Sequence, residues 1–163
     1  MDAQGAIRNG WQSSDMISQA YLGDLTDAEL LVRSVPGINH IAWQLGHLIT
    51  SEHEMLNGVF PGSMPALPAG FAERHSKTTA SNDNAADFLS KAEYLRLAAE
   101  QRAAASALLA KQSPTDFDKP APESMQGYAP TIGDVFAIIG SHWMMHAGQW
   151  VVVRRKLGRA PLF

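Results

Sequence analysis

Residues 135–153, VFAIIGSHWMMHAGQWVVV, decide how this chain folds. The run is almost entirely apolar, and a helix that is apolar on all sides is expected to be buried on most of them. His142 and His146 stand four positions apart within it. Side chains at positions i and i+4 of a helix point the same way. We therefore expect two imidazoles to face one spot inside the protein.

Helical spacing recurs in the rest of the chain, and we see no convincing strand alternation. The expected helices are residues 3–22, 38–60 (ending at Pro61-Gly62), 86–112, and a last one from Thr131 to about Gly158. Residues 61–85 are rich in Pro, Gly, Ser and Asn, and residues 114–130 contain four prolines, which indicates two long connections. Four long helices with such connections predict an all-α fold, a four-helix bundle of the antiparallel type. At 163 residues we expect one domain, residues 1–163.

Composition excludes several classes of function. The chain has no cysteine, so disulfides, thiolate metal ligands and a cysteine nucleophile are excluded. The net charge of -3 and the lack of a basic run give no case for binding nucleic acid or an anionic membrane. We see neither a secretory signal nor an apolar run of about 18 residues, so a cytoplasmic protein is expected.

The histidine pair suggests a metal site. Two buried imidazoles need partners, and a divalent metal is the most economical common one. A catalytic metal usually keeps three protein ligands and an open position, and the third ligand should come from the helix expected over residues 38–60. The spacing of His142 and His146 is equally compatible with two core histidines satisfied by hydrogen bonds.

Periodicity alone does not select the third histidine. His40 and His47 are seven residues apart and are expected to share a helix face, opposite an apolar seam formed by Ala42, Leu45 and Ile49. That position places His47 beside the main core, at a pocket or at the surface. Taken alone, the position of His47 favours its interpretation as a histidine on a polar face over its interpretation as a metal ligand.

Two other histidines are expected to lie outside any site. His75 falls in a polar connection and is expected to be exposed. His53 lies between Glu52 and Glu54, and a solvated local pair explains it.

Two motifs resemble a known family. The segment IAWQLGHL, residues 41–48, resembles the W-x-L-G-H-L segment of DinB-like proteins (the DinB/YfiT superfamily). The segment HWMMHAGQ, residues 142–149, followed by Arg154 or Arg155, Leu157-Gly158 and Pro161, resembles the C-terminal signature of that family. Both motifs occur in the expected order and separation.

This resemblance implies a fold, a cofactor and a partner. It implies a four-helix bundle with a divalent metal held by three histidines, which correspond here to His47, His142 and His146. It also implies frequent homodimers. Some relatives use a low-molecular-weight thiol, such as mycothiol or bacillithiol, in transfer or isomerisation, and many have no known activity.

Other residues near the motifs have two interpretations each. Gln149 lies three residues after His146, where it would either orient a ligand histidine or make a structural hydrogen bond. Glu54 shares the helix face of His47 and is the one nearby carboxylate that we nominate as a proton acceptor, although a solvated surface charge is the favoured interpretation. The three tryptophans near the histidines are expected to pack in the core: Trp43, Trp143 and Trp150.

The sequence thus leaves three functions open. The first is a divalent-metal-dependent enzyme for a small-molecule substrate, either a thiol-dependent transferase or isomerase, or a hydrolase. Histidine ligands suit zinc, nickel, copper or ferrous iron, and a thiol would have to come from outside the chain. The second is a stress-related protein that binds a metal or small ligand without turnover. The third is a structural, dimeric helical protein with core histidines.

Overall fold

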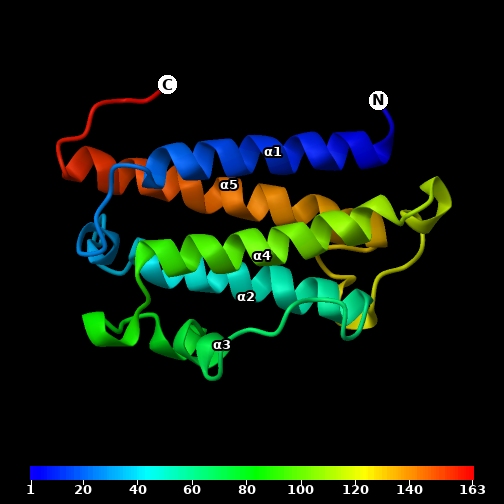
Figure 1. The fold of residues 1–163 in the computed structure, drawn as a ribbon, viewed down its shortest axis with the longest axis horizontal. Coiled ribbons are helices and arrows are strands. Elements are labelled where there is room, and N and C mark those ends of the chain that lie inside the picture. Colours follow the sequence, from blue (N-terminus) through cyan, green and yellow to red (C-terminus); the bar gives the residue numbers. More distant parts are fainter.

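The computed structural model describes residues 1–163 and contains helices but no strand. Its α-helices are α1 (Ala3–Leu22), α2 (Ile41–Val59), α3 (Phe71–Arg74), α4 (Lys91–Ala110) and α5 (Ile132–Lys156). The connections also contain 3-10 turns at Glu29–Leu31, Lys77–Thr79, Ala85–Asp87, Pro114–Asp116 and Glu123–Met125. The four long helices lie side by side and α3 lies outside them (Figure 1). The predicted all-α four-helix bundle is confirmed.

Helices α1 and α5 pack together and run in the same direction. In the first half of both, Trp11 Nε1 donates a hydrogen bond of 2.9 Å to the carbonyl oxygen of Phe136. Near the end of both, Arg154 donates one of 2.9 Å to the carbonyl oxygen of Tyr21. The contacts therefore advance together along the two helices, as Figure 1 shows.

Helix α2 runs opposite to α5, and α4 runs opposite to α1. In the first pair, Gln44 contacts Gln149 and Glu52 contacts Trp143, so residue numbers rise on one helix as they fall on the other. In the second pair, the corresponding contacts are Gln4 with Leu109 and Asp15 with Arg102. Helices α2 and α4 are consequently parallel to each other.

This topology corrects the expected antiparallel type. Parallel neighbours need a connection that returns along the length of the bundle, whereas antiparallel neighbours need only a short loop. Helix α2 has 19 residues and is about 28 Å long. The connection of residues 60–90, which includes α3, makes that return to the start of α4.

Capping residues set the helix starts more sharply than periodicity does. We expected a helix from residue 38, but α2 begins at Ile41 because His40 is its N-cap and accepts a hydrogen bond of 3.1 Å at Nδ1 from the Trp43 N–H. The expectation that His40 shares a helix face with His47 is therefore wrong. Helix α4 begins at Lys91 rather than residue 86, because Ser90 and Glu93 form a capping box.

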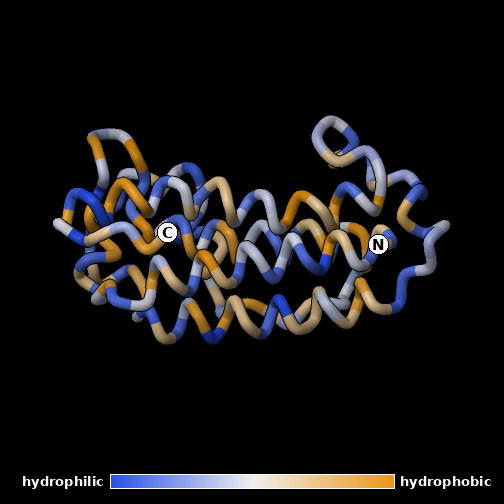
Figure 2. Tube along the Cα trace, turned by 90° about the horizontal axis from the view of Figure 1, so that it is seen from above, coloured by the Kyte–Doolittle hydropathy of each residue, from blue (hydrophilic) through white to orange (hydrophobic).

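The expectation that α5 is buried on most sides is wrong in part. Its inner face joins the core through Phe136, Ile139 and Trp150. Its outer face carries the exposed side chains of Met144 and Val152, and Met145 is exposed beside His142. Figure 2 shows apolar and polar stretches alternating along the bundle helices, and none of these helices combines the length and the apolarity that crossing a membrane requires.

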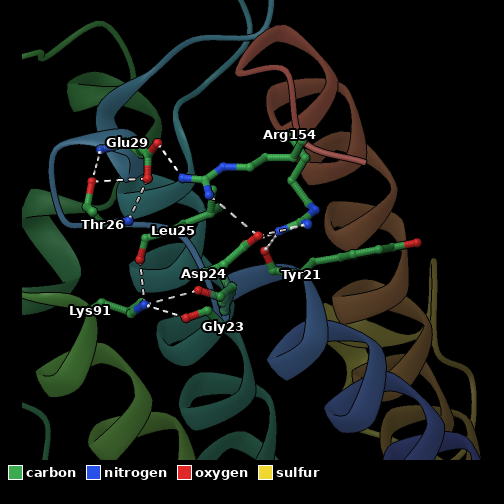
Figure 3. Close-up of polar contacts among 10 residues, drawn as sticks. Tyr21, Gly23, Asp24, Leu25, Thr26, Glu29, Lys91 and Arg154 are labelled. Carbon is green, nitrogen blue, oxygen red and sulfur yellow. Dashed lines mark hydrogen bonds and ion pairs between the residues drawn. The ribbon is translucent and has the colours of Figure 1, made fainter. Parts of the chain in front are cut away.

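A polar network fixes the α1–α2 connection against α4 and α5 (Figure 3). Arg154 of α5 is buried and pairs with Asp24, while also donating to the carbonyl of Tyr21. Lys91 of α4 donates to the carbonyl of Leu22, the last residue of α1, and to the carbonyls of Gly23 and Leu25 in the connection. The arginine of the C-terminal motif thus supports the fold, at the end of the bundle where α2 begins.

Candidate metal centre

Three histidines from two antiparallel helices meet in the bundle. Each of His47 on α2 and His142 and His146 on α5 offers one ring nitrogen, and these nitrogens lie within 4.8 Å of one another. The ring of His47 lies with its centroid 5.1 Å from that of His142 and 5.5 Å from that of His146. The two α5 histidines are 5.0 Å apart by the same measure, as their one-turn spacing predicts.

The ring of His47 is held by an aromatic neighbour on its own helix. Trp43, one turn earlier, stacks on it with centroids 5.1 Å apart and an angle of 13° between the planes. Trp43 is itself buried and donates from Nε1 to the Thr79 hydroxyl, at 3.3 Å. Stacking leaves the edge of the imidazole, with its nitrogens, free to face His142 and His146.

Gln44 fixes the tautomer of His146. The Gln44 Oε1 atom lies 2.8 Å from Trp150 Nε1, which can only donate, so this atom must be the amide oxygen. The same oxygen lies 3.0 Å from His146 Nδ1 and can only accept there. His146 therefore carries its proton on Nδ1, and its Nε2 lone pair is left available for a metal ion.

Burial keeps all three imidazoles neutral at pH 7. Desolvation lowers the pKa of His142 to about 4 and that of His146 to about 3, with smaller contributions from the neighbouring histidines. Desolvation also lowers the pKa of His47, helped by the positive charge of Lys77. A neutral imidazole is the form that binds a metal.

The donor set fits a divalent ion. Imidazole nitrogens bind zinc at about 2.0–2.1 Å, so two such ligands are at most about 4.2 Å apart. Nitrogens already within 4.8 Å of one another need at most a small inward rotation of the rings to reach that spacing. Three neutral nitrogen donors are also the ligand set of known catalytic zinc sites.

A cavity of about 740 Å³ opens beside the histidines. Its lining comes from α2, from α5 and from the connection that precedes α5: Ser51, Glu54 and Met55; Ile138, Ser141, His142 and Met145; Ser124, Met125 and Tyr128. His142 is the one histidine among them. Glu54 also reaches this cavity, but its side chain is exposed.

Gln149 contacts the histidine cluster only through another residue. Its Oε1 atom accepts a hydrogen bond of 3.0 Å from Gln44 Nε2. The residue in contact with His146 is thus Gln44, which sequence reasoning did not single out. A polar side chain one turn before His47, on a helix that is buried nearly all round, was the available signal.

His75 is buried, so the expectation that it is exposed is wrong. The residue is 2% exposed, and its ring nitrogens lie 2.7 Å from the carbonyl of Phe71 and 2.8 Å from the hydroxyl of Tyr94. The ring packs on α2 at Gly46, where a Cβ atom would overlap it. The glycine of the W-x-L-G-H-L motif therefore makes room for a histidine from the α2–α4 connection.

The expected solvated pair around His53 is also wrong. Glu52 is 2% exposed, and its Oε2 atom lies 3.2 Å from Trp143 Nε1 and 3.4 Å from Arg102. Burial raises the pKa of Glu52 to about 7. His53 contacts Gln101 at 3.2 Å instead. Glu52 follows the apolar seam at helical spacing, seven residues after Leu45, and that position was a signal for its burial.

Sequence comparison agrees with this geometry. A model of the DinB superfamily matches residues 12–150, which include all three histidines of the cluster. The chain belongs to the DinB superfamily. Comparisons with curated proteins and with solved structures found no match. The family and the helical fold are thus shown, and the clustered histidines agree with the metal binding known in the DinB superfamily.

Proposed function

We propose that this DinB-superfamily protein is a divalent-metal-dependent enzyme with His47, His142 and His146 as the metal ligands. The observation that carries the proposal is the meeting of three neutral imidazoles, within 4.8 Å of one another, beside a cavity large enough for a small molecule. Zinc, nickel and iron all suit these ligands.

The residues around the cluster have distinct roles in this proposal. When bound, a divalent ion with three neutral ligands keeps its charge of +2 and lowers the pKa of a water or thiol at its open position. Gln44 and Trp43 hold the rings of His146 and His47 in place. Glu54 is the one carboxylate in the cavity and the candidate to accept a proton.

Two reaction classes follow from this arrangement. Because the chain has no cysteine, thiol-dependent transfer or isomerisation would use an external low-molecular-weight thiol. With water in place of the thiol, the same residues would support hydrolysis. The substrate in either case is a small molecule that enters the cavity next to His142.

The second candidate is a non-catalytic protein that binds a metal or small ligand. One observation favours it: the sole carboxylate of the cavity is solvent-exposed, and no acid or base forms a hydrogen bond with the rings of His47 or His142. A screen of the metal-loaded protein for thiol transfer and hydrolysis distinguishes the two candidates. Turnover in this screen would favour the enzyme over the non-catalytic protein.

Two further expectations complete the proposal. A cytoplasmic location is expected from the sequence. Homodimerisation is expected from the family resemblance, and the exposed apolar side chains on the outer face of α5 support it. A light-scattering mass near twice 17.7 kDa would establish the dimer, and a mass near 17.7 kDa would exclude it.

The test of the proposal compares wild type with His146→Ala. We expect the variant to lose bound metal and, with it, any thiol-transfer or hydrolytic activity found in the wild type. Circular dichroism establishes that the variant is folded. The proposal fails if His146→Ala leaves both the metal content and every detected activity unaltered.

A further inference from the structure

The cavity beside the histidines has an apolar wall built from three methionines. Met55 comes from α2, Met145 from α5 and Met125 from the connection before α5. Met125 packs so closely on α2 that a Cβ atom at Gly58 would overlap it, which seats the connection over the end of the cavity. Methionine is flexible and polarizable, so such a wall adapts to apolar bodies of different shape.

The cavity carries negative charge and no positive charge. Glu54 is the single charged side chain among the ten residues that line it, and no lysine or arginine is among them. Glu54 forms no ion pair with any residue of the chain, whereas other carboxylates such as Asp15 and Asp24 pair with arginines. A cationic group in the cavity would therefore find an available carboxylate, whereas an anionic group would find no lysine or arginine to pair with and would be repelled by Glu54.

Glu54 and the histidine cluster lie at different levels along the bundle. Glu54 follows His47 by seven residues, so the two side chains project from the same side of α2 at positions about 10 Å apart along its axis. His142 lines the cavity from α5, beside His47.

We propose that this cavity binds a small amphiphile with a protonated amine at one end and an apolar body, the amine pairing with Glu54 and the opposite end facing His142. In this inference Glu54 binds the amine and no longer serves as the proton acceptor of the reaction. The inference rests on the proposed function only in taking the His142 end as the reacting end. It names the substrate class as cationic and apolar, and it excludes phosphorylated and carboxylated substrates that would carry their charge to Glu54.

The test uses three molecules with one carbon skeleton: 4-phenylbutylamine, 4-phenylbutan-1-ol and 4-phenylbutanoate. Their binding is measured by isothermal titration calorimetry at low salt in metal-free protein, so that no ion can hold the carboxylate. We expect the amine to bind about 30-fold more tightly than the acid, with the alcohol between them, because attraction and repulsion by one carboxylate near 4 Å add. The preference should shrink as salt is added.

Variants of Glu54 assign the preference to that residue. Glu54→Gln should bring the amine to the affinity of the alcohol, and Glu54→Lys should reverse the order so that the acid binds best. Glu54 is exposed, so neither change is expected to disturb the fold. Glu73→Lys is the matched control: it makes the same charge change at an exposed residue of α3 outside the cavity, and it should keep the wild-type order.

The outcomes separate this inference from the proposed function. No binding of the amine, equal binding of amine and acid, or an unchanged order in Glu54→Lys would overturn the inference, whatever the metal content. The expected order in a protein that takes up no zinc, nickel or iron would support the ligand class and overturn the metal-dependent function. Metal uptake without the charge preference would support the metal-dependent function and overturn the ligand class.

Discussion

Replacing Gln44 by methionine tests how the histidine cluster is held. Methionine keeps the length and approximate volume of the glutamine side chain but cannot accept the two hydrogen bonds from His146 Nδ1 and Trp150 Nε1. Each buried donor left without a partner costs about 1–3 kcal/mol. The two together predict a loss of about 2–6 kcal/mol in the free energy of unfolding, measured by urea denaturation of the metal-free protein.

The same substitution should weaken metal binding. Loss of the hydrogen bond to a ligating histidine typically lowers metal affinity about 10–100-fold, because the ring is then free to rotate and its proton is free to move to Nε2. Competition with a chromogenic zinc chelator measures this change directly. The measurement is made well below the denaturant midpoint, where the variant is folded.

Gln101→Met is the matched control for Gln44→Met. Gln101 is an equally buried glutamine that contacts His53 and the carbonyl of Pro65, away from the three clustered histidines. It should destabilise the protein without changing zinc affinity. Equal zinc affinities for Gln44→Met and Gln101→Met would refute the role given to Gln44.

Two further predictions concern the surroundings of the cluster. Burial raises the pKa of Glu52 from 4.5 to about 7, so the folded protein binds this proton more tightly than the unfolded chain does. As pH rises from about 4.5 to about 7, ionisation of Glu52 therefore lowers the free energy of unfolding, by about 3 kcal/mol in all. Glu52→Gln should therefore equal wild type in urea denaturation at pH 4 and exceed it by about 3 kcal/mol at pH 8; equal stability at both pH values would contradict the burial argument. Gly46→Ala should destabilise the protein by about 1–3 kcal/mol, since its Cβ atom would overlap the His75 ring. Gly148→Ala, at a helical glycine with open space around its Cβ position, is the control and should not destabilise it.

Local signals in the sequence predicted the helices well. Thr131 and Asp134 form the capping box that starts α5, and the one-turn spacing of His142 and His146 places both rings at one spot. These features depend on residues close together in the chain, where helix geometry alone fixes the relation between side chains. Periodicity could not select His47, because it says nothing of which face of α2 meets α5; the family motif identified this residue instead.

Features that depend on contacts between distant segments were missed. His75 lies in a connection whose composition indicates exposure, yet it is buried because Gly46 leaves space for it on α2. The place of Glu52 on an apolar seam was a signal for its burial, but its partners Arg102 and Trp143 come from other helices and could not be read from the pattern. The parallel course of α2 and α4 likewise follows from packing, which a helix pattern does not specify.

The most direct test of the central proposal is the metal content of the protein. Mass spectrometry of untagged protein, purified without chelator and incubated with zinc, nickel or ferrous iron, should give about one metal ion per chain. The His142→Ala/His146→Ala double variant, folded by circular dichroism, should bind none, while His53→Ala should bind as wild type does. No metal in the wild type under any of these conditions, or full metal content in the double variant, would contradict the assignment of His47, His142 and His146 as a metal centre.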